Sequence, residues 1–198
     1  MTARELAEKS LPRLRRFDVR PYLPALRGCN DGALGDILNT NGCAYYQWTP
    51  GLIELVKPKQ IVELGGAMGA WSLMALNGPY QDFDLWSITL PEGGLEFSFI
   101  QDAYPNFHPI VADDLDLANW PKELDLAKTD LWFLDSEHTY EQLKAEIELY
   151  TPFFKKGAVL LFDDIRMPQL TPLWDGLPHD KCDMTDPLHY SGYGLCIV

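Results

Sequence analysis

Short apolar runs alternate with segments of helical periodicity along this chain, and the pattern predicts strands interleaved with helices. The strand candidates are residues 60–64, 83–90, 107–111, 130–134 and 158–162, with a last apolar run at 194–198. The runs at 130–134 and 158–162 are apolar on both faces, which is typical of buried parallel strands.

Helices are predicted between these runs. Residues 70–76 and 95–103 have helical patterns. Thr49 and Pro50 read as the N-cap and first residue of a helix that ends before Pro58.

A further helix is predicted to begin after Thr139, with Gln142 three residues later completing a capping box. Its apolar positions fall on one face and its charged positions on the other.

Strands that alternate with helices predict an α/β fold with a doubly wound, mostly parallel sheet. Residues 1–45 carry several prolines and glycines and are predicted to form a helical, loop-rich N-terminal arm or lid. Residues 46–198 are predicted to form the main domain. In such a sheet, ligands bind beyond the carboxyl ends of the strands, where the strand order reverses.

The charge distribution limits the partners. The 198-residue chain has a net charge of -13, which argues against nucleic acid as a substrate because phosphate binding needs clustered Lys and Arg. Residues 1–27 hold seven basic residues and three acidic ones, so the arm is basic and the rest of the chain carries the excess acid. This arm is either an ordinary solvated helix or a contact to a second subunit in a homo-oligomer.

The four cysteines show no C-x-x-C pairing, so no structural zinc site is predicted. The N-terminus has no apolar signal-peptide core, and no run approaches the ~18 apolar residues of a membrane span. We therefore expect a cytoplasmic protein with no membrane partner.

The segment from Glu63 to Ser72 carries the clearest chemical signal. A strand runs into glycines at Gly65, Gly66 and Gly69, and a helix follows. The spacing differs from the G-x-G-x-x-G of dinucleotide-binding loops, and no lysine follows as in a phosphate-binding loop. The alternative is a tight turn between strand and helix in which the glycines serve only packing.

The pattern resembles motif I of the class I S-adenosylmethionine-dependent methyltransferases, in the form found in catechol O-methyltransferase and its relatives. The resemblance implies a Rossmann-like methyltransferase fold, a seven-stranded sheet with an antiparallel C-terminal strand. It also implies a set of cofactor-binding residues. These are Gln47, Glu63, Gly65, Gly66, Gly69, Ser72, Glu92, Asp113 and Asp135, with Glu92 standing later than the usual ribose-binding acid.

Carboxylates follow two predicted strands that are expected to be neighbours. Asp135 follows the strand at 130–134, and Asp163 and Asp164 follow the strand at 158–162. Packed together they would repel one another unless protonated or bound to a cation. An oxygen-only cluster suits Mg²⁺, or alternatively Mn²⁺ or Ca²⁺. The alternative is that the two aspartates of 163–164 cap a helix and Asp135 satisfies loop amides.

Residues 130–141 and 157–164 resemble the small O-methyltransferases related to macrocin O-methyltransferase and the neighbouring cephalosporin-hydroxylase-like group. The resemblance implies that Asp135, Asp163 and Asp164 bind the metal and that Asp135 or His138 takes the substrate proton. His138 could equally pack under its loop and orient it.

We therefore expect an S-adenosylmethionine-dependent O-methyltransferase that acts on a hydroxyl of a small molecule (a sugar, natural product or aromatic) with help from Mg²⁺. The alternatives are a metal-independent methyltransferase and a non-catalytic cofactor-binding protein. An oxygenase is disfavoured because the four histidines (His108, His138, His179 and His189) are scattered and show no two-histidine, one-carboxylate pattern. Tyr45, Tyr46, Trp48 and the segment around Arg166 are expected to line the substrate pocket.

Overall fold

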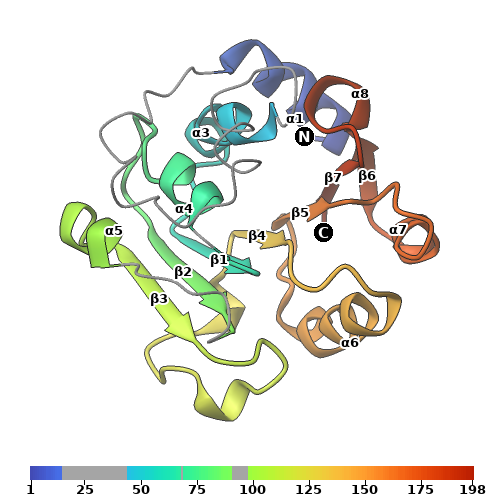
Figure 1. The fold of residues 1–198 in the computed structure, drawn as a ribbon. Helices are drawn as coiled ribbons and strands as arrows, with labels where there is room; N and C mark the ends of the chain where they lie inside the picture. The colour runs from blue at the N-terminus through green and yellow to red at the C-terminus, as the bar shows by residue number, and fades with distance from the viewer. Residues whose placement is uncertain (15–43, 68, 91–97) are drawn as a thin grey trace.

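A seven-stranded sheet lies between two layers of helices in the computed structural model, which describes residues 1–14, 44–67, 69–90 and 98–198 (Figure 1). The strands are β1 (Gln60–Leu64), β2 (Asp84–Thr89), β3 (Phe107–Val111), β4 (Leu131–Leu134), β5 (Val159–Asp163), β6 (Asp180–Asp183) and β7 (Tyr193–Ile197). The α-helices are α1 (Ala3–Ser10), α3 (Tyr45–Val56), α4 (Ala70–Ala75), α5 (Ser98–Ala103), α6 (Tyr140–Tyr150), α7 (Thr171–Gly176) and α8 (Thr185–Leu188). Short 3₁₀ helices are η1 (Leu11–Arg13), η4 (Leu117–Asn119), η5 (Leu126–Lys128) and η6 (Thr151–Phe153).

The strand order is β3-β2-β1-β4-β5-β7-β6. Strands β1 to β5 are parallel to their neighbours in that series, and β7 runs antiparallel to both β5 and β6. The chain moves outward from β1 through β2 to β3 and then returns to β4 on the other side of β1. The strand order therefore reverses between β1 and β4, and the predicted fold class is confirmed.

Alternate residues of each strand enter two separate cores, as the two-residue period of a strand requires. Ile61 and Phe133 belong to the core under α1, α3 and α4, whereas Val62 and Trp132 belong to the core under α6 and α7. Trp132 is fully buried there and packs against Tyr150 of α6, with ring centroids 5.3 Å apart. Both faces of the sheet are thus covered by side chains of the helices.

The first helix, α1, packs into the core that it shares with α3 and α4. Leu6 of α1 is 1% exposed, and the Nε1 of Trp48 in α3 donates to the buried Oγ of Ser10 at 2.8 Å. Four basic residues of the predicted arm (Arg15, Arg16, Arg20 and Arg27) lie outside the described residues. The role of the arm as a lid or subunit contact therefore stays a prediction.

The predicted start of the helix at Thr49 and Pro50 is wrong. Helix α3 begins four residues earlier, at Tyr45, and Pro50 lies inside it. Tyr45 and Trp48 are both buried, and their burial offsets the cost of an internal proline. The Oγ1 of Thr49 donates to the carbonyl of Tyr45 at 2.8 Å instead of capping a helix.

Two further details differ from the sequence prediction. Strand β6 was not predicted, because its four residues, Asp-Lys-Cys-Asp, are mostly polar and lie at the sheet edge. The capping box at α6 is half formed. Thr139 accepts from the backbone of Gln142, but the Gln142 side chain turns away to Asp114 and Glu146.

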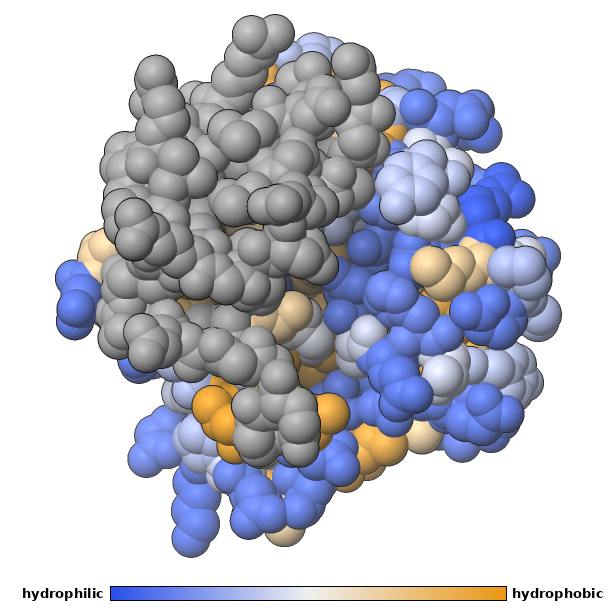
Figure 2. Space-filling model, in the orientation of Figure 1, coloured by the Kyte–Doolittle hydropathy of each residue, from blue (hydrophilic) through white to orange (hydrophobic). Residues whose placement is uncertain are grey.

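The visible part of the described surface is mostly hydrophilic, with apolar residues gathered near the lower edge of the view in Figure 2. Within the described ranges, none of the helices is long and apolar enough to cross a bilayer.

Gly65 and Gly157 form a matched pair for testing how tightly β1 and β4 are joined. Both have a left-handed φ, 86° and 84°, but a Cβ on Gly65 would stand 1.8 Å from the carbonyl oxygen of Asp135, whereas a Cβ on Gly157 would meet nothing within 4 Å. Gly157→Ala should lower the free energy of unfolding by about 1–2 kcal/mol, the cost of the left-handed conformation. Gly65→Ala should cost about 1–3 kcal/mol more, because overpacking is added.

Urea unfolding of both variants measures this difference. Equal losses in the two variants would show that the loop after β1 does not press against the end of β4.

Candidate active site at the carboxyl ends of the strands

The glycine loop after β1 is held between β2 and β4. The N–H groups of Gly65 and Gly66 both donate to the carbonyl of Ile88, at 3.0 and 2.8 Å. A Cβ on Gly66 would stand 2.1 Å from the Oγ of Ser87. Gly69 has φ 73° and is the N-cap of α4. The left-handed backbone at Gly65 and Gly69 and the contact with the Ser87 side chain at Gly66 therefore favour glycine, independently of any ligand.

Glu63 lies beneath this loop and is 1% exposed. Its Oε2 accepts hydrogen bonds from the hydroxyls of Ser72 and Ser87, the latter at 2.5 Å. Burial raises the pKa of Glu63 to about 7, although the two hydroxyl donors act against this shift. Glu63 and Ser72, two of the predicted cofactor-binding residues, are thus hydrogen-bonded to one another below the loop.

A cavity of about 560 Å³ opens at the carboxyl ends of β1 to β4. Of the predicted cofactor residues, Gly65, Asp113 and Asp135 line it. The remaining described ones (Gln47, Glu63, Gly66, Gly69 and Ser72) are buried and are not part of its lining. Glu92 lies outside the described residues. The cavity therefore occupies the place where the strand order reverses, as a ligand site in this fold class should.

Two neighbouring aspartates behave differently at the rim of this cavity. The Oδ1 of Asp113, an exposed residue, accepts from the backbone N–H of Leu115 at 2.8 Å, which is a turn cap. Asp114 is buried, and its Oδ1 accepts from Gln142 at 2.7 Å. Burial raises the pKa of Asp114, and burial together with the charge of Asp114 raises the pKa of Glu146 to about 8.

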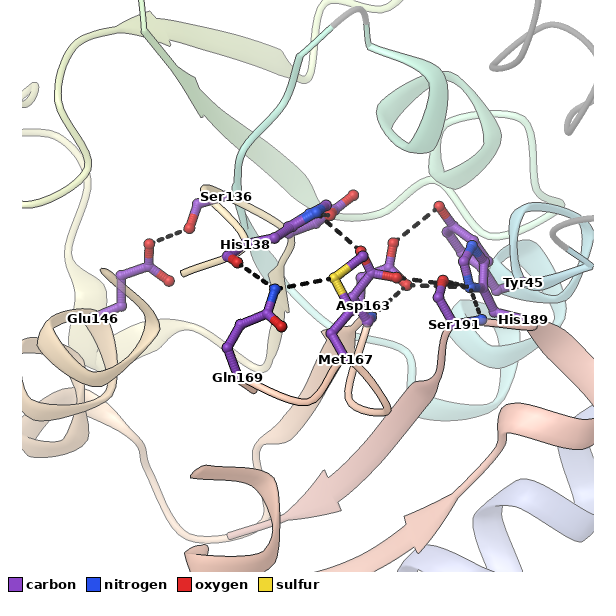
Figure 3. A network of polar contacts seen from close by, with 11 residues as sticks. Tyr45, Ser136, His138, Glu146, Asp163, Met167, Gln169, His189 and Ser191 are labelled. Atoms are coloured by element: carbon purple, nitrogen blue, oxygen red, sulfur yellow. Dashed lines mark hydrogen bonds and ion pairs between the residues drawn. The ribbon is translucent and has the colours of Figure 1, made fainter. Parts of the chain in front are cut away.

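The three predicted metal ligands converge at the ends of β4 and β5. His138 joins two of them: its Nε2 lies 3.0 Å from Oδ1 of Asp135, and its Nδ1 lies 3.0 Å from Oδ2 of Asp164. On the other side, the buried hydroxyl of Tyr45 donates to Oδ2 of Asp163 at 3.4 Å. Figure 3 shows the contacts that run from His138 past Asp163 to Tyr45 and His189, with the Ser136–Glu146 hydrogen bond separate from them.

Asp164 has an unusual backbone conformation. Its φ is 57°, in the left-handed region that is uncommon for residues other than glycine. Its N–H donates to the carbonyl of Gly192 at 2.8 Å and to Oδ1 of Asp163 at 2.9 Å. These bonds to the preceding side chain and to the β7 side hold a strained residue in place, and strain of this kind concentrates at functional sites.

The electrostatics of the cluster show strong crowding of negative charge. Burial, followed by the charges of Asp135 and Asp164, raises the pKa of Asp163 well above its ordinary value. Hydrogen bonds to Asp135 and Asp164 raise the pKa of His138 to about 10. Burial acts to raise the pKa of Asp164, but the hydrogen bonds from His138 and Ser191 and the charges of His138 and His189 together outweigh it, and the pKa falls. At neutral pH the cluster therefore holds a proton on His138.

The donor set fits a divalent cation. Asp163, Asp164 and His189 each offer a ligand atom, and these atoms lie within 4.8 Å of one another. The Oδ1 of Asp164 is buried and has no hydrogen-bond partner among the described residues. An anionic oxygen left without a donor is costly unless a cation or proton balances it.

The observed group differs from the predicted one in one member. Asp163 and Asp164 are shared, Asp135 is connected to them through His138, and His189 was not predicted. His189 lies between α8 and β7, far from the other ligands in sequence, and only the antiparallel pairing of β7 with β5 brings it close.

Two residues expected in the substrate pocket have other roles. Trp48 is 0% exposed and belongs to the core beneath α1. Arg166 is exposed and forms an ion pair with Asp183, at the start of the antiparallel edge of the sheet. Arg166 and Asp183 line a separate cavity of about 360 Å³, so Arg166 stays a candidate for a pocket other than the one at β1 to β4.

Comparison with known families identifies the class. Residues 62–165 match the family model described as "Methyltransferase domain", and the chain belongs to this family. It is an S-adenosylmethionine-dependent methyltransferase of the class I fold. A search of curated proteins finds no match.

Solved structures share the fold at low sequence identity. A Podospora anserina methyltransferase bound to SAH is 13% identical, with a TM-score of 0.64, and the alignment covers 98% of this chain and 94% of that one. A Bacillus cereus O-methyltransferase in complex with SAH is 14% identical, with a TM-score of 0.60 and coverage of 95% and 99%. A Staphylococcus aureus protein described as a caffeoyl-CoA O-methyltransferase is 16% identical, with a TM-score of 0.63 and coverage of 90% and 97%.

Glu63→Gln tests the buried carboxyl under the loop. The pKa of about 7 lies above the ordinary 4.5, so the folded protein holds a proton that the unfolded chain releases between these pH values. Wild-type stability should therefore fall relative to the variant by roughly 2–3 kcal/mol between pH 5 and pH 8. Urea unfolding at the two pH values measures this.

Glu141→Gln, an exposed change on α6, is the matched control and should leave the pH dependence of the wild type unaltered. If the stability curves of Glu63→Gln and the wild type run parallel from pH 5 to pH 8, Glu63 is ionised throughout and the argument fails.

Proposed function

We propose that this methyltransferase transfers the methyl group of S-adenosylmethionine to a hydroxyl group of a small molecule, such as a sugar, a natural product or an aromatic compound, with a divalent cation bound beside the acceptor. Mg²⁺ is the cation that the sequence favours. The methyl donor occupies the cavity at β1 to β4, and the acceptor lies toward the ends of β4 and β5.

The position of Asp135 is the observation that carries the proposal. Asp135 lines the cavity together with Gly65, and it is also bonded to His138, which is bonded in turn to Asp164. One residue thus belongs both to the cavity for the donor and to the acidic cluster. Methyl transfer requires its two reactants to be held at contact distance, and the benefit of such positioning is large.

The residues divide the work as follows. Gly65 and Asp113 border the cofactor, and Asp135, Asp163 and Asp164 hold the cation. A bound cation lowers the pKa of a hydroxyl group that it contacts and so makes the oxygen nucleophilic. Tyr45 keeps one oxygen of Asp163 directed by its hydrogen bond of 3.4 Å.

His138 or Asp135 takes the proton from the acceptor hydroxyl. With both carboxylates beside it, His138 holds its own proton at neutral pH, since its pKa is about 10. The imidazole therefore serves as a base only where another positive charge balances Asp135 and Asp164. Proton transfer to His138 therefore depends on a cation being bound at the acidic cluster.

Two other functions compete with this proposal. In a metal-independent methyltransferase, transfer would survive a chelator. In a non-catalytic cofactor-binding protein, S-adenosylhomocysteine would bind but no acceptor would be methylated. A homo-oligomer formed through the basic N-terminal residues is a separate expectation about partners.

Asp164→Ala should abolish methyl transfer, a loss of at least about 100-fold, because it removes the unpartnered buried oxygen that the cation needs. The affinity for S-adenosylhomocysteine should change less than about threefold, since Asp164 does not line the cofactor cavity. Labelled methyl transfer to a panel of catechols and glycosides measures the first, and calorimetry measures the second.

Asp102→Ala, on the exposed surface of α5, is the control and should behave as the wild type. Transfer that persists in Asp164→Ala, or in wild-type protein treated with EDTA, would establish the metal-independent alternative. Cofactor binding without transfer to any acceptor, in the wild type with Mg²⁺, would favour the non-catalytic one.

A further inference from the structure

His189 faces the two aspartates that end β5. Its Nδ1 lies 4.0 Å from Oδ1 of Asp163 and 4.0 Å from Oδ1 of Asp164. All three side chains are buried, with exposed fractions of 7%, 8% and 4%. The group is therefore an enclosed one, in contrast to a collection of surface acids.

The hydrogen bonds of His189 show which atom faces the carboxylates. Ser191 contacts Nδ1 twice, with its backbone N–H at 3.2 Å and with its Oγ at 2.6 Å. A ring nitrogen that accepts an N–H carries a lone pair and no proton, so the proton of the neutral imidazole is on Nε2. Nδ1 has one lone pair, so a cation bound there would take the place of the Ser191 contacts. Of the two carboxylate oxygens nearest Nδ1, Oδ1 of Asp164 has no hydrogen-bond donor among the described residues.

The distances suit a shared cation better than direct contact. At 4.0 Å, the imidazole nitrogen is too far from either oxygen for a hydrogen bond. Two ligands that each lie about 2.1 Å from one ion can be at most about 4.2 Å apart. One ion can therefore reach Nδ1 and either oxygen if small side-chain movements close the wide angle that a separation of 4.0 Å leaves between the two ligands.

The loop that carries His189 is tied to Asp164 directly. The N–H of Asp164 donates to the carbonyl of Gly192 at 2.8 Å, and the N–H of Gly192 donates to the carbonyl of His189 at 3.2 Å. Gly192 has φ 116°, and a Cβ there would stand 2.4 Å from the backbone nitrogen of Arg166. The imidazole ring also packs against Tyr45, with centroids 5.1 Å apart. The position of the ring is thus fixed relative to the two carboxylates.

We propose that Nδ1 of His189 is a metal ligand alongside Asp163 and Asp164, and that this nitrogen makes the site prefer a first-row transition metal, from Mn²⁺ to Zn²⁺, over Mg²⁺ and Ca²⁺. The inference rests on the proposed function only in placing a divalent cation at the acidic cluster. Imidazole nitrogen favours the transition metals, whereas a site made of oxygen alone suits Mg²⁺ and Ca²⁺.

The test uses Mn²⁺ as the probe in the full-length protein. Pulsed electron paramagnetic resonance of bound Mn²⁺ should show coupling to a histidine nitrogen in the wild type. His189→Asn offers an amide oxygen in place of Nδ1, so the nitrogen coupling should disappear. In calorimetry, the ratio of Mn²⁺ to Mg²⁺ affinity should fall at least about tenfold in this variant.

Two variants serve as controls. His179→Asn carries the same substitution before β6, outside the cluster, and should keep the wild-type spectrum and affinity ratio. His138→Asn should also keep the nitrogen coupling, which assigns the signal to His189. The wild-type spectrum needs no variant and remains a test if His189→Asn does not fold.

Bound Mn²⁺ without nitrogen coupling in the wild type would overturn the inference while leaving the proposed cation site intact. Unchanged coupling and affinity ratio in folded His189→Asn would also overturn it. If the wild type binds neither Mn²⁺ nor Mg²⁺, the cation site of the proposed function fails, and the inference fails with it.

Discussion

Repulsion among Asp135, Asp163 and Asp164 is the constraint around which this end of the sheet is organised. Parallel pairing of β4 with β5 brings the carboxyl ends of the two strands together, and burial removes the water that would screen their charges. The neighbouring side chains reduce this repulsion. His138 bridges two of the carboxylates, Tyr45 donates to the third, and the pKa of Asp163 is raised by burial and by the neighbouring charges.

Other buried acids along the same edge are stabilised without a cation, and the difference lies in their donors. Glu63 receives two hydroxyl hydrogen bonds on one oxygen. Glu146 receives hydrogen bonds from Ser136 and Gln142 at Oε1, and the pair it forms with Asp114 lies beside the cavity. Oε2 of Glu146 is buried without a hydrogen-bond partner among the described residues, and the pKa of about 8 allows this carboxyl to hold a proton at neutral pH. Within the described residues, the cluster at β5 combines several carboxylates, a strained backbone and an oxygen without a donor, and this combination supports the proposal of a cation site there.

Much of the fold could be predicted from the sequence because the buried strands have a recognisable apolar pattern. Residues 130–134 and 158–162 are apolar on both faces, which only a covered parallel sheet explains. Strand β6 carries no such pattern, because its position depends on pairing with β7 and not on its own burial. The start of α3 was misplaced for a related reason: Thr49 and Pro50 have strong local preferences, but the burial of Tyr45 and Trp48 is a tertiary effect that outweighs them.

The residues of the candidate site also fall into two groups, those that local sequence predicts and those that depend on tertiary pairing. Asp135, Asp163 and Asp164 follow strands directly, so the rule that ligands bind beyond the carboxyl ends of parallel strands was enough to find them. His189 precedes an antiparallel strand, and its approach to Asp164 depends on the register in which Asp163 pairs with Tyr193. The spacing of residues in the sequence does not reveal that register. For this reason the four histidines show no ligand pattern in the sequence. By returning the chain beside β5, the antiparallel strand β7 brings His189 next to Asp163 and Asp164 and so supplies the nitrogen proposed as a ligand at this site.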